Sequence, residues 1–226
     1  MHVCLFDIDG TLINTAGAGK LAMETALQVA FGIADPTPAR NIPFAGRTDR
    51  GIALDLFAEH GIPDTAANWQ HFLATYLECL PRCLAARPGE VLPGVLELIA
   101  QLSRLEHVEL ALLTGNVREG ALRKLGHFQL DRHFEWGGFG DEHPHRDDVA
   151  RLAYAELTRR YPAPIDLERV WVIGDTPSDV LCGRAIGARV IAVATGMHTL
   201  DELRRSEPDH LFPNFADPSG ILQLWK

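Results

Sequence analysis

Residues 3–11 read VCLFDIDGT, an apolar run that ends in two aspartates, a glycine and a threonine. A short, nearly continuous apolar run, here residues 3–8, is typical of a strand buried on both faces of a parallel sheet. Side chains two apart in a strand point the same way, so Asp7 and Asp9 can approach one site. Their charges repel unless a proton or a cation such as Mg²⁺ lies near them. Taken alone, the pair is equally compatible with ordinary strand-end and turn chemistry.

Apolar runs of the same kind recur downstream and alternate with helical patterns. The runs are at 108–114, 170–175 and 189–195, with weaker ones at 134–136 and 210–212. The helical patterns are at 94–104, 117–125, 147–160, 179–186 and 200–205. This alternation predicts βαβ units with right-handed crossovers, hence an α/β fold with a doubly wound, Rossmann-like parallel sheet.

The segment between the first and second strong runs breaks this alternation. It contains helical patterns at 21–31, 50–60 and 67–85 with no strand between them, and glycine and proline punctuate its ends at 16–19 and 87–89. We therefore expect an inserted all-helical cap domain at 16–87 and an α/β core made of 1–15 and 88–226.

Polar residues end two further runs, at the sheet edge where ligands of open α/β sheets bind. The first run ends in Thr114-Gly115-Asn116, whose hydroxyl and N–H groups could hold a phosphoryl oxygen or simply cap a helix. The second ends in Asp175, followed by Asp179. Asp175 could complete a metal site, while Asp179 could orient that site or cap the next helix.

Together these motifs resemble those of the haloacid dehalogenase-like hydrolase superfamily. Its members carry, in order, Asp-x-Asp-Gly-Thr, a strand-terminal Thr or Ser, a basic residue, and Gly-Asp-x-x-x-Asp. Three of the four match here, at residues 7–11, 114 and 174–179. The insertion lies where subclass I members, such as phosphoglycolate phosphatases and β-phosphoglucomutases, carry a helical cap.

The resemblance implies a role for each matching residue. Asp7 would attack phosphorus to form an aspartyl-phosphate, and Asp9 would protonate the leaving group and then activate water. Asp7, the backbone carbonyl of Asp9, and Asp175 would hold Mg²⁺, with Asp179 supporting them from behind. Thr114 would bind the phosphoryl group. The neighbouring Gly10, Thr11, Gly115 and Asn116 are expected around the substrate.

The basic residue departs from the family pattern, which usually has lysine. The chain contains only Lys20, Lys124 and Lys226, and Arg146 stands in the expected place before the run at 170–175. Arginine keeps the charge and can grip phosphate with two donors, so we expect Arg146 to substitute, the alternative being a solvated helix start. Lys124 is expected on a surface face.

Two polar segments near these motifs are open to a second interpretation. His143 and His145 flank Arg146, but a polar loop at a helix start needs no metal to explain it. In the insertion, residues 44–49 lie where relatives place a substrate-specificity loop. Arg47 could contact the non-reacting end of a substrate; alternatively Thr48 or Asp49 caps the next helix and Arg47 is solvated.

The net charge limits the classes of molecule that the protein is expected to bind. A net charge of −9 disfavours nucleic acid and anionic membranes, which require basic surface, and favours a small phosphorylated metabolite. The four cysteines show no CxxC pairing, and no signal peptide or membrane-spanning run is evident, so the expected compartment is the cytoplasm. The sequence leaves the oligomeric state open.

We therefore predict a Mg²⁺-dependent phosphatase that hydrolyses a small phosphomonoester, phosphoglycolate-like or a sugar phosphate. A β-phosphoglucomutase-type phosphomutase shares the same core residues, and Arg146 in place of lysine leaves room for a weakly catalytic phosphate-binding regulatory protein. A dehalogenase has no need of Asp9, and a phosphonatase would need a cap lysine, for which Lys20 is the only candidate.

Overall fold

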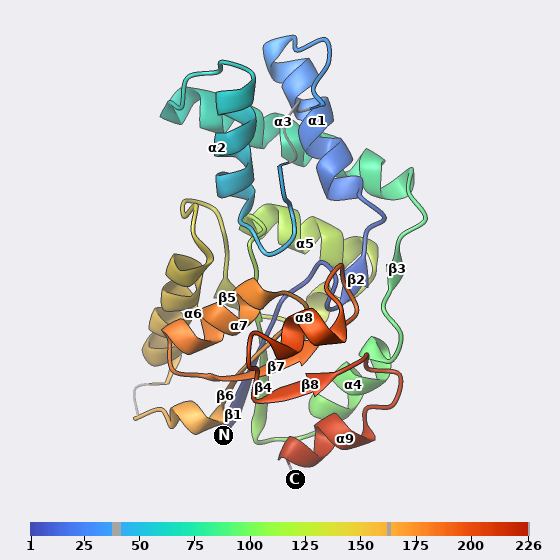
Figure 1. Ribbon diagram of the computed structural model, residues 1–226, viewed down its shortest axis with the longest axis vertical. Helices are drawn as coiled ribbons and strands as arrows, with labels where there is room; N and C mark the ends of the chain where they lie inside the picture. The colour runs from blue at the N-terminus through green and yellow to red at the C-terminus, as the bar shows by residue number, and fades with distance from the viewer. Residues whose placement is uncertain (38–41, 162–163, 226) are drawn as a thin grey trace.

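The computed structural model describes residues 1–37, 42–161 and 164–225. Within these residues a six-stranded parallel sheet has the order β5-β4-β1-β6-β7-β8 (Figure 1). The strands are β1 (His2–Phe6), β4 (Val108–Leu113), β5 (Gly137–Gly138), β6 (Val170–Gly174), β7 (Arg189–Val193) and β8 (His210–Phe212). The chain runs from β1 outward to β5 and then returns to β6 on the other side of β1. The crevice for a ligand is therefore expected beyond the ends of β1 and β6.

Helices cover both faces of the sheet. Buried residues of α4 (Val95–Leu102), α5 (Arg118–His127) and α9 (Ser219–Leu222) pack on one face with Cys4 and Phe6. Buried residues of α6 (Arg146–Arg160), α7 (Pro177–Ala185) and α8 (Leu200–Arg204) pack on the other with Val3 and Leu5. The alternation along β1 explains why the sequence shows a continuous apolar run, because both faces are buried. This three-layer arrangement confirms the predicted fold class.

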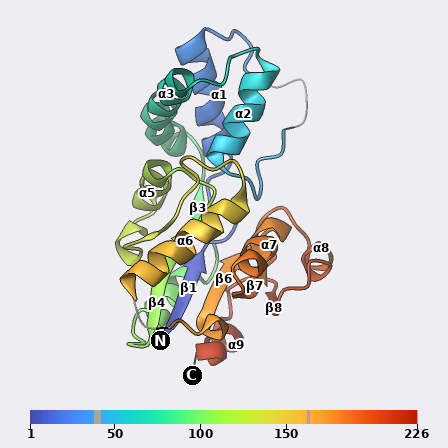
Figure 2. The same ribbon diagram turned by 90° about the vertical axis from the view of Figure 1, so that its left-hand side faces the viewer.

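Three helices form a second unit beyond the carboxyl ends of the strands, at the top of Figures 1 and 2. They are α1 (Ala18–Phe31), α2 (Asp49–Glu59) and α3 (Ala66–Ala85), called here the helical unit. It has its own apolar cluster, which includes Met23, Leu27, Phe57, Phe72 and Tyr76. Thr48 and Thr65 cap α2 and α3 by accepting backbone N–H groups of Gly51 and Asn68. The apolar face of each helix is thus satisfied largely inside this unit.

A short antiparallel ribbon carries the chain between the sheet and the helical unit. Its strands are β2 (Ile13–Asn14) and β3 (Glu90–Val91), with Ile13 opposite Val91. Two-residue strands are too short to show a period of two, so the residue pattern does not predict them.

Most elements begin or end one to three residues away from the expected bounds, and two of these differences have a clear physical reason. The strand expected at 134–136 lies directly after that segment, at Gly137–Gly138. The first bond to β4 is made by the Trp136 carbonyl, which accepts from the Leu112 backbone N–H. A Cβ on Gly137 would lie 2.5 Å from the Leu112 carbonyl, so glycine permits this close approach. Helix α7 begins at Pro177, before the expected Asp179, because Thr176 and Asp179 form a capping box. No helix in the described residues is long and apolar enough to cross a membrane.

Candidate active site

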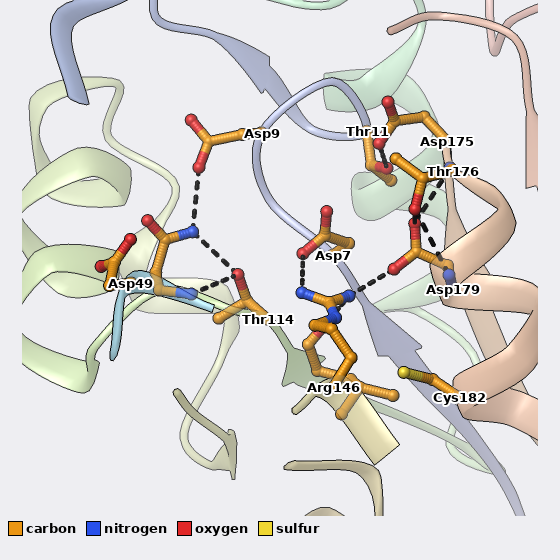
Figure 3. A network of polar contacts seen from close by, with 12 residues as sticks. Asp7, Asp9, Thr11, Asp49, Thr114, Arg146, Asp175, Thr176, Asp179 and Cys182 are labelled. Atoms are coloured by element: carbon orange, nitrogen blue, oxygen red, sulfur yellow. Dashed lines mark hydrogen bonds and ion pairs between the residues drawn. The ribbon is translucent and has the colours of Figure 1, made fainter. Parts of the chain in front are cut away.

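A cavity of about 370 Å³ lies between the strand ends and the helical unit. Most of the residues expected at the site line it: Asp7, Asp9, Gly10, Arg47, Thr114, Gly115, Asn116, Arg146 and Asp175. Thr11 and Asp179 are fully buried just behind it. Figure 3 shows the core side chains of this group converging from β1, from the loops after β4 and β6, and from the start of α6. The topology therefore brings motifs more than 100 residues apart to one place.

Asp7 is fixed at the end of β1. Its backbone N–H donates to the Ile173 carbonyl of β6 at 2.9 Å, and its Oδ1 accepts from Arg146 Nη1 at 3.3 Å. Burial raises the pKa of Asp7 to about 7, although the guanidinium of Arg146 opposes this shift. A buried carboxylate needs more positive charge than one arginine supplies, because Arg146 also pairs with Asp179.

Three buried carboxyl groups make up a candidate metal centre. Oxygens of Asp7, Asp175 and Asp179 all lie within 4.8 Å of one another. When ionised, they leave two negative charges uncompensated by Arg146, which suits a divalent, oxygen-seeking cation. Burial, with Asp179 and Asp7 nearby, raises the pKa of Asp175 well above its usual range. The donor set therefore fits Mg²⁺.

The hydrogen bonds of this cluster show which of the three carboxylates have an oxygen available for a cation. Asp179 Oδ1 accepts from Arg146 Nη2, and its Oδ2 accepts from the Thr176 backbone N–H at 3.0 Å and hydroxyl at 2.7 Å. Both oxygens of Asp179 are thus engaged, which leaves Asp7 and Asp175 as the carboxylates free to turn to a cation. Asp179 therefore caps α7, as one alternative predicted, and the same side chain also contacts Arg146.

Gly10 and Thr11 place Asp175. Thr11 Oγ1 donates to Asp175 Oδ1 at 3.1 Å. Gly10 has φ +84°, and a Cβ there would lie 2.4 Å from Asp175 Oδ2. Only glycine combines that backbone conformation with room for the carboxylate.

Thr114 and Asn116 form the opposite wall of the cavity. Asn116 Nδ2 donates to Thr114 Oγ1 at 2.8 Å and to Asp9 Oδ2 at 2.9 Å. Neither residue caps α5 with its side chain, since the position before the helix is Val117 and no side-chain cap bond is made there. The Thr114 hydroxyl and this amide thus lie on the Asp9 side of the cavity.

The prediction that Lys124 lies on a surface face was wrong. Its side chain is 5% exposed, and its Nζ donates to Asp9 Oδ2 and to Asn116 Oδ1, each at 2.6 Å. Helical spacing does indicate this burial, because Lys124 shares the buried stripe of α5 with Ala121 and Leu125. The charge of the side chain alone favours a surface position. Burial would lower the pKa of Lys124, but the carboxylates of Asp9 and Asp49 outweigh it and the net shift is upward. Lys124 therefore stays a cation.

The helical unit reaches the core through residues 44–49. The Asp49 backbone N–H donates to the Gly115 carbonyl at 2.7 Å, and Asp49 Oδ2 accepts from the Val117 N–H at 2.9 Å. Thr48 caps α2, as one interpretation proposed, yet Arg47 is not simply solvated. Its guanidinium pairs with Asp55 and donates to the Gly51 carbonyl at 3.1 Å, beside the cavity.

The histidines beside Arg146 lie outside the cavity lining and outside the acidic cluster. His145 is exposed and His143 half-buried. Their positions give no geometric support to a role as metal ligands.

Comparisons with known proteins agree with this geometry. The family model described as haloacid dehalogenase-like hydrolase matches residues 4–184. "Probable phosphatase IndB" of Dickeya dadantii is 28% identical over 96% of this chain and 91% of its own. Phosphoglycolate phosphatase 1 of Pseudomonas aeruginosa is 27% identical over 96% and 78%. The crystal structure of a hydrolase from Pseudomonas syringae shares the fold, with a TM-score of 0.70, 21% identity and coverage of 99% and 98%.

Proposed function

The chain belongs to the haloacid dehalogenase-like hydrolase family and is a phosphatase, and we propose that it hydrolyses a small phosphomonoester with Mg²⁺ through an aspartyl-phosphate on Asp7. The observation that carries the proposal is the buried cluster of Asp7, Asp175 and Asp179 around Arg146, open to a cavity on the Asp7 side. In the proposal the helical unit belongs to a cap domain, residues 16–87, over a core of 1–15 and 88–226.

Asp7 is the nucleophile in this scheme. Its Oδ1 is held by Arg146, so Oδ2 forms the bond to phosphorus while the bond to the leaving oxygen breaks. Asp9 gives its proton to that leaving oxygen. It then takes a proton from water as the water attacks the aspartyl-phosphate, which frees Asp7 and releases phosphate. The second step thus returns Asp7 to its free carboxylate and Asp9 to its protonated form, ready for another substrate.

The remaining residues orient the phosphoryl group and its charge. The Thr114 hydroxyl and the Asn116 amide border the cavity where the phosphoryl oxygens would lie. Mg²⁺, held by Asp7, Asp175 and the backbone carbonyl of Asp9, would neutralise charge on the transferring group. Arg146 keeps Asp7 in place and offsets part of the cluster's charge. Positioning and charge compensation are what phosphoryl transfer chiefly requires.

The cavity favours a small anionic substrate. Its volume of about 370 Å³ matches a small metabolite, and its lining includes Lys20 of α1 and Arg47 of the loop before α2. Two cations in the lining suit a phosphate ester with a second anionic or polar end. Phosphoglycolate and sugar phosphates are therefore the first compounds to test, and several relatives are named phosphoglycolate phosphatase.

The test is hydrolysis of p-nitrophenyl phosphate by the wild type with Mg²⁺, by the wild type with EDTA, and by Asp7→Asn. Both EDTA and the substitution should reduce turnover by about a thousandfold or more. An Asp7→Asn variant with wild-type turnover would exclude the covalent mechanism. Full activity in EDTA would exclude the metal. Screening of phosphoglycolate and sugar phosphates then identifies the substrate class.

A further inference from the structure

Two donors converge on one oxygen of Asp9. Lys124 Nζ approaches Asp9 Oδ2 at 2.6 Å and Asn116 Nδ2 approaches the same atom at 2.9 Å. The Asp9 side chain is 38% exposed, toward the cavity that it lines, whereas the Lys124 side chain is 5% exposed. Asn116 lies in the loop after β4, where its amide also contacts Thr114. Asp9 is therefore held on one oxygen while its carboxyl group stays accessible.

The donors are themselves fixed. Lys124 Nζ also donates to Asn116 Oδ1 at 2.6 Å, and Asn116 Nδ2 also donates to Thr114 Oγ1 at 2.8 Å. Asp49 of the helical unit adds a second negative charge near the ammonium. A side chain so constrained on a helix can hold a carboxylate in one orientation, whereas a solvated lysine could not.

We propose that Lys124 is the positioning residue for Asp9: it holds Oδ2, so that Oδ1 faces the leaving oxygen and carries the transferred proton. The inference rests on the proposed role of Asp9 as general acid and base. It gives the site two cations with separate tasks, because Arg146 serves Asp7 and Asp179 while Lys124 serves Asp9. The family pattern led us to expect a single basic residue.

A residue that acts through the general acid has an effect that depends on the leaving group. Phenyl phosphate releases a strongly basic phenolate that needs the proton of Asp9, whereas 2,4-dinitrophenyl phosphate releases a weakly basic phenolate that leaves without it. The value of kcat/KM for each compound reports formation of the aspartyl-phosphate, before hydrolysis of the intermediate. Their ratio is also independent of the fraction of folded enzyme.

The experiment compares this ratio in the wild type, Lys124→Met, Lys124→Gln and Asp9→Asn. General acid catalysis contributes about 10²–10⁴-fold, so loss of positioning should lower kcat/KM for phenyl phosphate about tenfold or more beyond any loss for the dinitrophenyl ester. Lys124→Gln keeps a hydrogen-bond donor, so its ratio should lie between those of Lys124→Met and the wild type. It also replaces Lys124→Met in the test if that variant does not fold. Arg123→Met removes a neighbouring cation of α5 that pairs with Glu119, and should leave the ratio unchanged.

The outcomes separate the two ideas. If Asp9→Asn and Lys124→Met both lose activity selectively on phenyl phosphate, the positioning role is supported. If Asp9→Asn is selective but both Lys124 variants lose activity equally on the two esters, Lys124 only balances buried charge and the inference is overturned. If Asp9→Asn itself shows no selectivity, the proposed general acid is wrong and Lys124 has no such partner to position.

Discussion

The guanidinium of Arg146 lies against the carboxylate of Asp7, with Nη1 donating to Oδ1 at 3.3 Å. Its Nη2 contacts Asp179, so one buried cation joins the candidate nucleophile to a carboxylate in the first turn of α7. A planar guanidinium can serve two carboxylates at once, whereas a lysine ammonium is a single compact charge. Arginine therefore suits this position, between two carboxylates, better than the lysine that the family usually carries there.

Replacing Arg146 tests this arrangement. Arg146→Met should lower the free energy of unfolding by about 3–5 kcal/mol, because it leaves buried carboxylates without their cation, and should abolish turnover. Arg146→Lys should retain more of both, since the ammonium can still reach one partner. Urea unfolding and p-nitrophenyl phosphate hydrolysis measure the two effects. Arg151→Met, at an exposed position of α6, is the control and should change neither value. If Arg146→Met were as stable as the wild type, Arg146 would not be compensating the charge of the buried carboxylates.

The strand ends were the most predictable part of the site. Apolar runs fixed where β1, β4 and β6 lie, and the polar residues directly after them, such as Asp7, Thr114 and Asp175, necessarily meet at one sheet edge. This follows from parallel topology alone and needs no knowledge of side-chain packing.

The rest depended on contacts that local sequence does not encode. Lys124 is buried because α5 packs below the helical unit and beside Asp9, although its charge alone suggests a surface position. The ribbon of β2 and β3 pairs segments 76 or more positions apart, over lengths too short for a pattern. Asp49 reaches Val117 only because two units meet. Each of these is a long-range contact, which periodicity cannot reveal.

Removing Asp175 should have opposite effects with and without Mg²⁺. Burial raises the pKa of Asp175, so its ionised form destabilises the metal-free protein as pH rises, and Asp175→Asn should be more stable than the wild type at pH 8 in EDTA. With Mg²⁺ at about 100 times its Kd, the wild type should gain about 2.7 kcal/mol and the variant much less. Thermal unfolding in both buffers measures this crossover. Asp201→Asn, at an exposed position, should leave stability unchanged in both buffers. If Mg²⁺ stabilised Asp175→Asn as much as the wild type, Asp175 would not be a ligand of the metal.

Asp49 should give stability a defined pH dependence. Burial, opposed by Lys124, raises its pKa from 3.8 to about 6, so the folded state binds this proton more tightly than the unfolded chain. Its contribution is then fully present below pH 4 and is lost as pH rises through 6, by about 3 kcal/mol. Asp49→Asn keeps an acceptor for the Val117 N–H and should lack this loss. Urea unfolding in EDTA from pH 4 to 8 should show the difference between variant and wild type growing over that window. A constant difference would mean that folding does not change the pKa of Asp49.

Gly115 should control how the helical unit meets the core. A Cβ at this position would lie 1.9 Å from the Arg47 carbonyl and 3.0 Å from Thr48 Cα, so Gly115→Ala must displace the loop at 44–49. Displacement of a substrate-positioning loop by about 1 Å can cost about 100-fold in rate, and we expect kcat/KM for the natural ester to fall by that order.

Two comparisons show whether the loss arises from this contact. Inorganic phosphate should still inhibit Gly115→Ala with nearly unchanged affinity, because the added methyl group points toward Arg47 rather than toward Thr114 and Asp7. Gly126→Ala, on an exposed turn of α5 where a Cβ meets nothing closer than 3.9 Å, should leave kcat/KM unchanged and add about 0.5–1 kcal/mol of stability. If Gly115→Ala retained wild-type kcat/KM, the contact between the loop and Gly115 would not belong to the reactive state, and the helical unit would have to act on the substrate from a different position.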